Sequence, residues 1–72
     1  MQKTNVIIVR VFKEKKYAYG LCESGEQVFV HDENCLDDLE TYHLGDTITA
    51  FLCNSPKGKL ATVCEKVKES KI

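Results

Sequence analysis

The stretch that decides the fold is KKYAYGLCESGEQVFVH, which spans residues 15–31. Its first half predicts a strand over Tyr17–Cys22, and its last five residues predict a second strand over Gln27–His31, with side chains in strict alternation. The polar residues between the strands, Glu23–Glu26, include a glycine that can adopt the positive φ of a tight turn. The stretch therefore predicts an antiparallel hairpin.

The second strand of this hairpin shows the clearest alternation. Val28 and Val30 lie on one face, whereas Phe29 and His31 lie on the other. Because valines are typical core residues, we expect the two rings to lie on the outer face.

The first strand of the hairpin places Tyr17 and Tyr19 on one face, so rings would stand side by side on neighbouring strands. The same alternation puts Leu21 on the tyrosine face. Only a β-bulge, for which Gly20 is the natural place, would turn Leu21 inward while the tyrosines stay outside. The tyrosines therefore have two alternative positions, on the outer face or in the core, and we favour the outer face.

Three further strands are predicted outside the hairpin. The segment NVIIVRVF is rich in β-branched residues, and we expect Val9 and Val11 to face inward, with Ile8, Arg10 and Phe12 facing outward. The other two strands are expected over residues 47–54 and 59–67, with a turn over residues 55–58 between them.

Five short strands in a chain of 72 residues predict an all-β fold with a single domain over residues 1–72. A three-stranded meander, a long connection and a closing hairpin are the layout of a five-stranded OB-type β-barrel. An SH3-like barrel is the alternative. We expect the tail from about residue 68 to be frayed.

Charge is distributed unevenly along the chain. Residues 1–22 carry five basic side chains and one acidic one, residues 23–46 carry eight acidic side chains and no Lys or Arg, and residues 47–72 carry five lysines and two glutamates. This segregation allows one basic face and one acidic face. Most of the acids lie in the long connection over residues 32–46. The side chains expected to anchor it, through a helical turn, are Leu36, Leu39, Tyr42 and Leu44.

Composition argues against several classes of protein. No apolar run approaches the roughly 20 residues of a membrane span, so we expect a cytoplasmic protein with no membrane partner. Cys22, Cys35, Cys53 and Cys64 lack the spacing of a zinc site, so we expect reduced thiols, with a disulfide or a metal as the alternative. His31 has no serine or cysteine at the spacing of a nucleophile. We therefore expect no enzyme, no catalytic residue, no metal and no cofactor.

Three motifs, in this order, are similar to those of cold-shock domains. VFVH (Val28–His31) matches the second RNA-binding motif of the family as it stands, and GDTI (Gly45–Ile48) and PKG (Pro56–Gly58) match in kind. The resemblance covers nearly the whole chain. It implies an OB-type barrel that binds single-stranded RNA or DNA and acts as an RNA chaperone or as a modulator of transcription or translation.

The first RNA-binding motif of the family, a Lys-Gly-Phe-Gly-Phe-like strand, is altered here to KKYAYGL. If Lys15 is the lysine of the motif, Tyr17 and Tyr19 take its two aromatic positions. If Lys16 is that lysine, the tyrosines fall on glycine positions instead. We favour the first of these two registers.

Two other departures concern the edges of the expected binding face. Asp32 follows the histidine where the family usually has an aromatic residue, and the common tryptophan of the first strand is absent, so that Phe12 is its nearest equivalent. The residues expected to stack on bases are Phe12, Tyr17, Tyr19, Phe29 and His31. The residues expected to contact phosphates are Arg10, Lys13, Lys15, Lys16, Lys57 and Lys59.

A second hypothesis belongs to a different functional class. The barrel would have lost nucleic-acid binding and would act as a protein-interaction module, with its acidic connection over residues 32–46 docking a basic partner. We expect a monomer in either case, with a dimer as the alternative.

Overall fold

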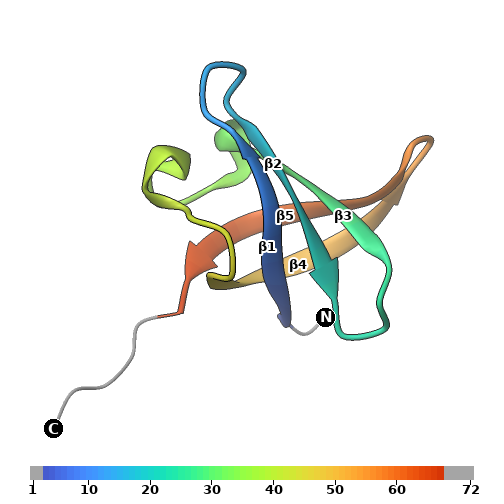
Figure 1. The fold of residues 1–72 in the computed structure, drawn as a ribbon. Coiled ribbons are helices and arrows are strands. Elements are labelled where there is room, and N and C mark those ends of the chain that lie inside the picture. The colour runs from blue at the N-terminus through green and yellow to red at the C-terminus, as the bar shows by residue number, and fades with distance from the viewer. Residues whose placement is uncertain (1–2, 68–72) are drawn as a thin grey trace, which may run out of the picture.

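The computed structural model describes residues 3–67, which form a closed β-barrel with the strand order β1-β2-β3-β5-β4 (Figure 1). The strands are β1 (Thr4–Phe12), β2 (Tyr17–Cys22), β3 (Gln27–His31), β4 (Thr47–Ser55) and β5 (Gly58–Lys66). Two short 3-10 helices, η1 (Asp32–Asn34) and η2 (Leu39–Thr41), lie in the connection between β3 and β4. Each predicted strand is present, with bounds that agree to within one residue. The tail expected to fray lies outside the described residues.

Strand pairing closes the barrel. β1 pairs antiparallel with β2 on one side and with β4 on the other, whereas β3 pairs in parallel with β5, with Val28 opposite Lys59. Parallel neighbours cannot be joined by a tight turn, so the chain crosses between β3 and β4 through the long connection and then returns along β5. This architecture confirms the predicted all-β, five-stranded OB-type barrel.

The core of the barrel consists of apolar side chains from all five strands, together with Leu39 of η2 and Tyr42 directly after it. Its fully buried members are Val6, Ile8, Ala18, Val28, Val30, Leu39, Tyr42, Ile48, Ala50, Ala61 and Cys64. Gly20 also faces inward, where β1 and β2 approach closely. A Cβ at Gly20 would collide with the side chain of Val6 and would lie 2.8 Å from the backbone oxygen of Ile7, so only glycine fits there.

A β-bulge in β1 changes which of its side chains face the core. Ile8 lies opposite Gly20 and Arg10 lies opposite Tyr19, so Val9 is an extra residue without a partner on β2. The prediction for these two positions was wrong, because Ile8 is buried and the side chain of Val9 is 39% exposed. After the bulge the side chains of β1 face the sides that were expected, with Val11 packed against the core.

The bulge also resolves the position of Leu21. The bulge lies in β1 rather than at Gly20, so β2 runs without interruption and its alternation of inward and outward side chains is preserved. Ala18 and Gly20 fill the inner face, and Leu21 stays on the outer face, 41% exposed. The inward turn expected for Leu21 therefore does not occur.

Two of the four expected anchors of the connection are in the core. Leu39 and Tyr42, at η2, are fully buried, whereas Leu36 and Leu44 are 65% and 68% exposed, so the prediction was wrong for the latter pair. Leu36 points outward because its neighbour Cys35 forms a bridge with β5 and turns inward toward it. Leu44 lies in a surface turn, which is closed by the hydrogen bond from the Asp46 N–H to the His43 carbonyl.

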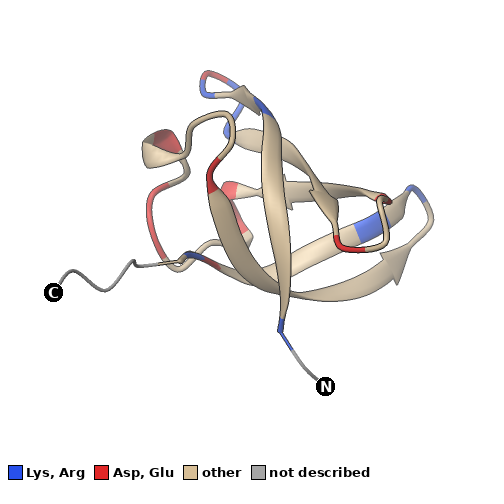
Figure 2. Cartoon of the chain, turned by 60° about the horizontal axis from the view of Figure 1, so that its bottom comes forward, with Lys and Arg blue, Asp and Glu red and all other residues tan. Residues whose placement is uncertain are grey.

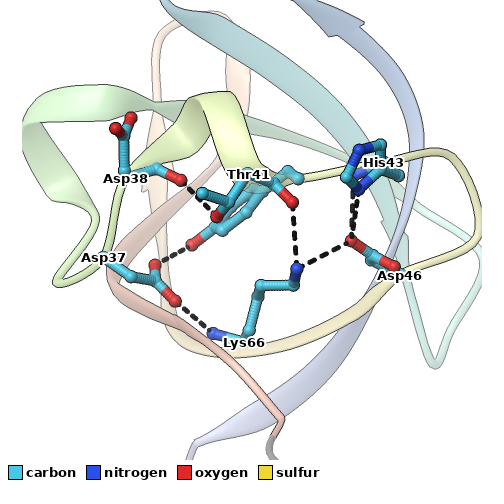
Figure 3. A network of polar contacts seen from close by, with 7 residues as sticks. Asp37, Asp38, Thr41, His43, Asp46 and Lys66 are labelled. Carbon is cyan, nitrogen blue, oxygen red and sulfur yellow. Dashed lines mark hydrogen bonds and ion pairs between the residues drawn. The ribbon is translucent and has the colours of Figure 1, made fainter.

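A polar network ties the connection to β5 (Figure 3). The hydroxyl of Tyr42 and the backbone N–H of Lys66 donate to the two oxygens of Asp37, over 2.5 Å and 2.9 Å. The ammonium group of Lys66 donates to the Thr41 carbonyl over 2.9 Å and lies 3.4 Å from the carboxylate of Asp46. Burial and the hydrogen bond to Asp37 raise the pKa of Tyr42, which therefore acts as a donor. Asp37 thus has a structural role.

Asp46 makes the stability of the fold depend on pH. The N–H of His43 donates to its carboxylate over 2.8 Å, and this bond, with the Lys66 ammonium, lowers the pKa of Asp46. A carboxyl group with a lower pKa in the folded state stabilises the protein above its unfolded pKa, and this contribution is lost as the pH falls through the folded value. We expect the free energy of unfolding to fall below about pH 4, and to fall less steeply in Asp46→Asn. Urea denaturation at a series of pH values checks this, and equal slopes for the two proteins would contradict it.

Candidate nucleic-acid interface

The structure brings all five predicted stacking residues onto one outer surface. Tyr17 lies between Phe12 on β1 and His31 on β3, and Tyr19 lies opposite Phe29. The ring centroids of neighbouring residues are 5.0 Å (Phe12–Tyr17) to 6.2 Å (Phe12–Tyr19) apart. We call this surface the aromatic face, and it comprises Phe12, Tyr17, Tyr19, Phe29 and His31. The alternative position of the tyrosines, inside the core, is excluded.

The rings of the aromatic face pack against one another at an angle. Interplanar angles range from 41° for Tyr17–Phe29 to 88° for Phe12–Tyr19, so the contacts are tilted or edge-to-face. Each ring of the aromatic face is partly exposed. The result is a continuous, uneven π-surface over three strands, which can stack flat molecules.

His31 is held at the edge of the aromatic face by the start of η1. Its Nδ1 accepts a hydrogen bond from the backbone N–H of Glu33 over 3.1 Å. In the neutral ring the proton is therefore on Nε2. The ring centroid lies 6.1 Å from that of Phe29, so His31 extends the aromatic face.

Basic side chains flank the aromatic face at two places. Figure 2 shows Lys and Arg gathered at the β1–β2 turn and again at the β4–β5 hairpin. At the first place, Arg10 lies beside Tyr19 in the strand register, and Lys13, Lys15 and Lys16 are exposed in the turn. The ion pairs found among residues 3–67 involve none of the six predicted phosphate-contacting residues.

The β4–β5 hairpin contributes the second group of cations. Tyr19 and Phe29 line an open groove together with Lys57 and Lys59, next to the parallel pairing of β3 with β5. The ammonium group of Lys59 donates to the side-chain oxygen of Asn54 over 3.0 Å, which holds it at this groove. The rings of the aromatic face therefore have cations at both ends.

Aspartates of the connection are engaged in local hydrogen bonds. Asp32 accepts from the N–H of Leu39 over 3.2 Å, and Asp38 caps η2 by accepting from the N–H of Glu40 over 3.0 Å. Because the carboxylate of Asp32 bonds to the connection, it is turned toward η2 although the residue follows His31 directly. The acidic character of this segment is therefore partly structural.

The four cysteines are free thiols, and two of them are neighbours. Cys35 and Cys64 form an isolated parallel bridge between the connection and β5. The thiol of Cys35 donates to the His31 carbonyl over 3.4 Å. The neighbouring Cys64 thiol lowers the pKa of Cys35, whereas the Cys35 thiol and burial raise the pKa of Cys64. Within residues 3–67, no group of three or more His, Cys, Asp or Glu side chains could hold a metal ion.

Neither a protein-family model nor a curated protein matches this sequence. In the described part of the chain, no helix has the length and the apolar character needed to cross a membrane.

One candidate site was missed in the sequence. A second groove runs along β1 on the side away from β2, and its lining includes Val9, His43 and Leu44. The sequence feature nearest to this groove is the run of β-branched residues Val6–Val9. Nothing in that run indicates that the alternation of inward and outward side chains breaks at Val9.

Proposed function

We propose that the protein binds single-stranded RNA or DNA, with bases stacked on the aromatic face and phosphates held by the flanking cations. The observation that carries this proposal is the convergence of five rings from β1, β2 and β3 on one outer surface. Every nucleobase has a π-face, so such a surface binds with little sequence preference, and each stacked base contributes about 1–3 kcal/mol.

The position of the tyrosines supports the resemblance to cold-shock domains. Tyr17 and Tyr19 point outward and Ala18 points inward, which agrees with the register in which Lys15 is the lysine of the first RNA-binding motif. We infer from this resemblance a role in keeping strands unpaired, as an RNA chaperone or as a modulator of transcription or translation in the cytoplasm. The protein would act without catalysis and without a cofactor.

A direct titration tests the proposal. A fluorescent mixed-sequence strand of about a dozen nucleotides, within the range of site sizes of OB-type barrels, is titrated with the protein at two salt concentrations. We expect micromolar or tighter binding that weakens as salt increases, because bound cations release counterions from the strand. The absence of binding at low salt would overturn the proposal.

The lysines of the β1–β2 turn provide a quantitative check. We expect Lys13→Gln and Lys15→Gln each to reduce the slope of log affinity against log salt by roughly 0.7, the value for one phosphate contact on a single strand. Lys3→Gln is the control, because Lys3 lies 3.7 Å from Glu65 and belongs to neither flanking group. Slopes that are equal in all three variants would remove the β1–β2 turn from the binding site.

The protein-interaction hypothesis receives no specific support from the contacts of residues 3–67. Asp37 accepts hydrogen bonds that hold the connection to β5, so charge reversal at this position would disturb the fold as well as any partner. Glu33 and Glu40 are exposed members of the same connection, and they are the better positions for that test.

A further inference from the structure

A groove of about 510 Å³ runs along the C-terminal half of β1, on the side opposite β2. β1 pairs with β4 only from Thr4 to Ile7, and Ile8 is the last β1 residue to bond with the connection, through Gly45 and Asp46. Beyond Ile8, therefore, the edge of β1 that faces away from β2 borders this groove.

The walls of the groove are apolar and accessible. The bulge in β1 turns Val9 outward, and the turn of the connection holds Leu44 opposite it, so both side chains are exposed, by 39% and 68%. Val11 also lines the groove. Exposed apolar side chains that gather in a concave site indicate contact with an apolar surface of a ligand.

The charged residues that line the groove carry positive charge or can acquire it. They are Arg10, Lys13 and His43, and the lining contains no Asp or Glu. Asp46 lies just outside the lining, 3.7 Å from the imidazole of His43, and its carboxylate is also 3.4 Å from the Lys66 ammonium. A ligand that suits the groove therefore has a flat or apolar part together with an anionic group.

Phe12 belongs both to the aromatic face and to the lining of this groove. A strand that crosses the aromatic face toward β1 reaches the groove directly after Phe12. Arg10 and Lys13, which flank the aromatic face, also line the groove. The two surfaces are thus continuous in both their apolar and their basic components.

We propose that the groove receives the next nucleotide of the strand bound on the aromatic face. Its base would pack against Val9, Val11 and Leu44, and its phosphate would lie near Arg10 and Lys13. This inference rests on the proposed function and extends the binding path of the strand from the aromatic face into the groove. It commits the strand to leave the barrel across β1, beside the connection.

A ladder of oligonucleotides of increasing length tests this, with Leu44→Asp compared to Leu36→Asp. Both leucines are exposed on the same connection, but only Leu44 lines the groove. We expect Leu44→Asp to bind the shortest strands like the wild type and to lose roughly four- to fifteen-fold in affinity for the longest, as for one or two methylene groups removed from contact. Leu36→Asp should follow the wild type at every length. Leu44→Ala, which adds no charge, should show a weaker loss with the same dependence on length.

The outcomes separate this inference from the proposed function. If the wild type binds no strand, both are overturned. If the wild type binds but Leu44→Asp matches it at every length, only the groove is overturned as a nucleotide site, and a peptide paired with the free edge of β1 becomes the better occupant. An equal loss for Leu44→Asp and Leu36→Asp would reflect charge alone, and it would also overturn the groove.

Discussion

Replacing Leu39 with alanine should lower the free energy of unfolding by about 2–5 kcal/mol, the usual effect of truncating a buried leucine. Leu39 is 1% exposed and is the buried residue of η2, where its backbone N–H donates to Asp32. It packs in the same cluster as Val6 and Ile48. A domain of this size has a total stability of about 4–11 kcal/mol, so the loss should be a large part of it.

Urea denaturation followed by circular dichroism measures the effect, and Leu36→Ala is the matched control. Leu36 lies in the same connection but is 65% exposed, so its truncation should change stability by no more than about 0.5 kcal/mol. Equal losses in the two variants would show that the connection does not contribute to the core in the way described. A loss confined to Leu39→Ala would show that the acidic connection is an integral part of the fold.

Replacing Phe29 with alanine should weaken oligonucleotide binding by about 1–3 kcal/mol while the barrel remains folded. Phe29 is near the centre of the aromatic face, with ring centroids at 5.4 Å from Tyr17, 5.6 Å from Tyr19 and 6.1 Å from His31. Its neighbours Val28 and Val30 fill the core, so removal of its ring leaves the interior intact. Titration with the same fluorescent strand gives the affinity, and circular dichroism verifies the fold.

Phe51→Ala is the control for this experiment. Phe51 is also a partly exposed aromatic residue, but it is on β4, where the Lys3 ammonium lies 5.7 Å from its ring centroid, and it takes no part in the aromatic face. We expect this variant to bind like the wild type. Equal affinities for Phe29→Ala and Phe51→Ala would show that bases do not stack on the aromatic face, and unfolding of Phe29→Ala would assign its ring to the core.

Much of the aromatic face could be predicted from local pattern. In β3, strict alternation assigned Val28 and Val30 to the core and Phe29 and His31 to the surface, because side chains of a strand point to opposite faces. The turn at Gly25 was equally predictable, since its φ of +87° is one that glycine adopts without strain. Once the hairpin was placed, the tyrosines of β2 could lie beside the rings of β3.

The local pattern failed where alternation breaks. At Val9 the chain contains an unbroken run of β-branched residues, so either phase is compatible with the sequence, and the bulge is decided by pairing with β2. The connection contains four large apolar side chains that the sequence does not distinguish from one another, but only Leu39 and Tyr42 reach the core. Their burial depends on the bridge between Cys35 and Cys64 and on the bonds of Asp37.

The sequence by itself determined the five strands, their turns, and the rings that share the outer face of β2 and β3, because these depend on neighbours along the chain. Only the tertiary structure decided the closure of the barrel, the bulge at Val9 and the groove between β1 and Leu44. Closure of the barrel and the groove bring together residues that are more than thirty positions apart, and the bulge depends on how β1 pairs with β2. Their positions follow from which side chains can fill one small core.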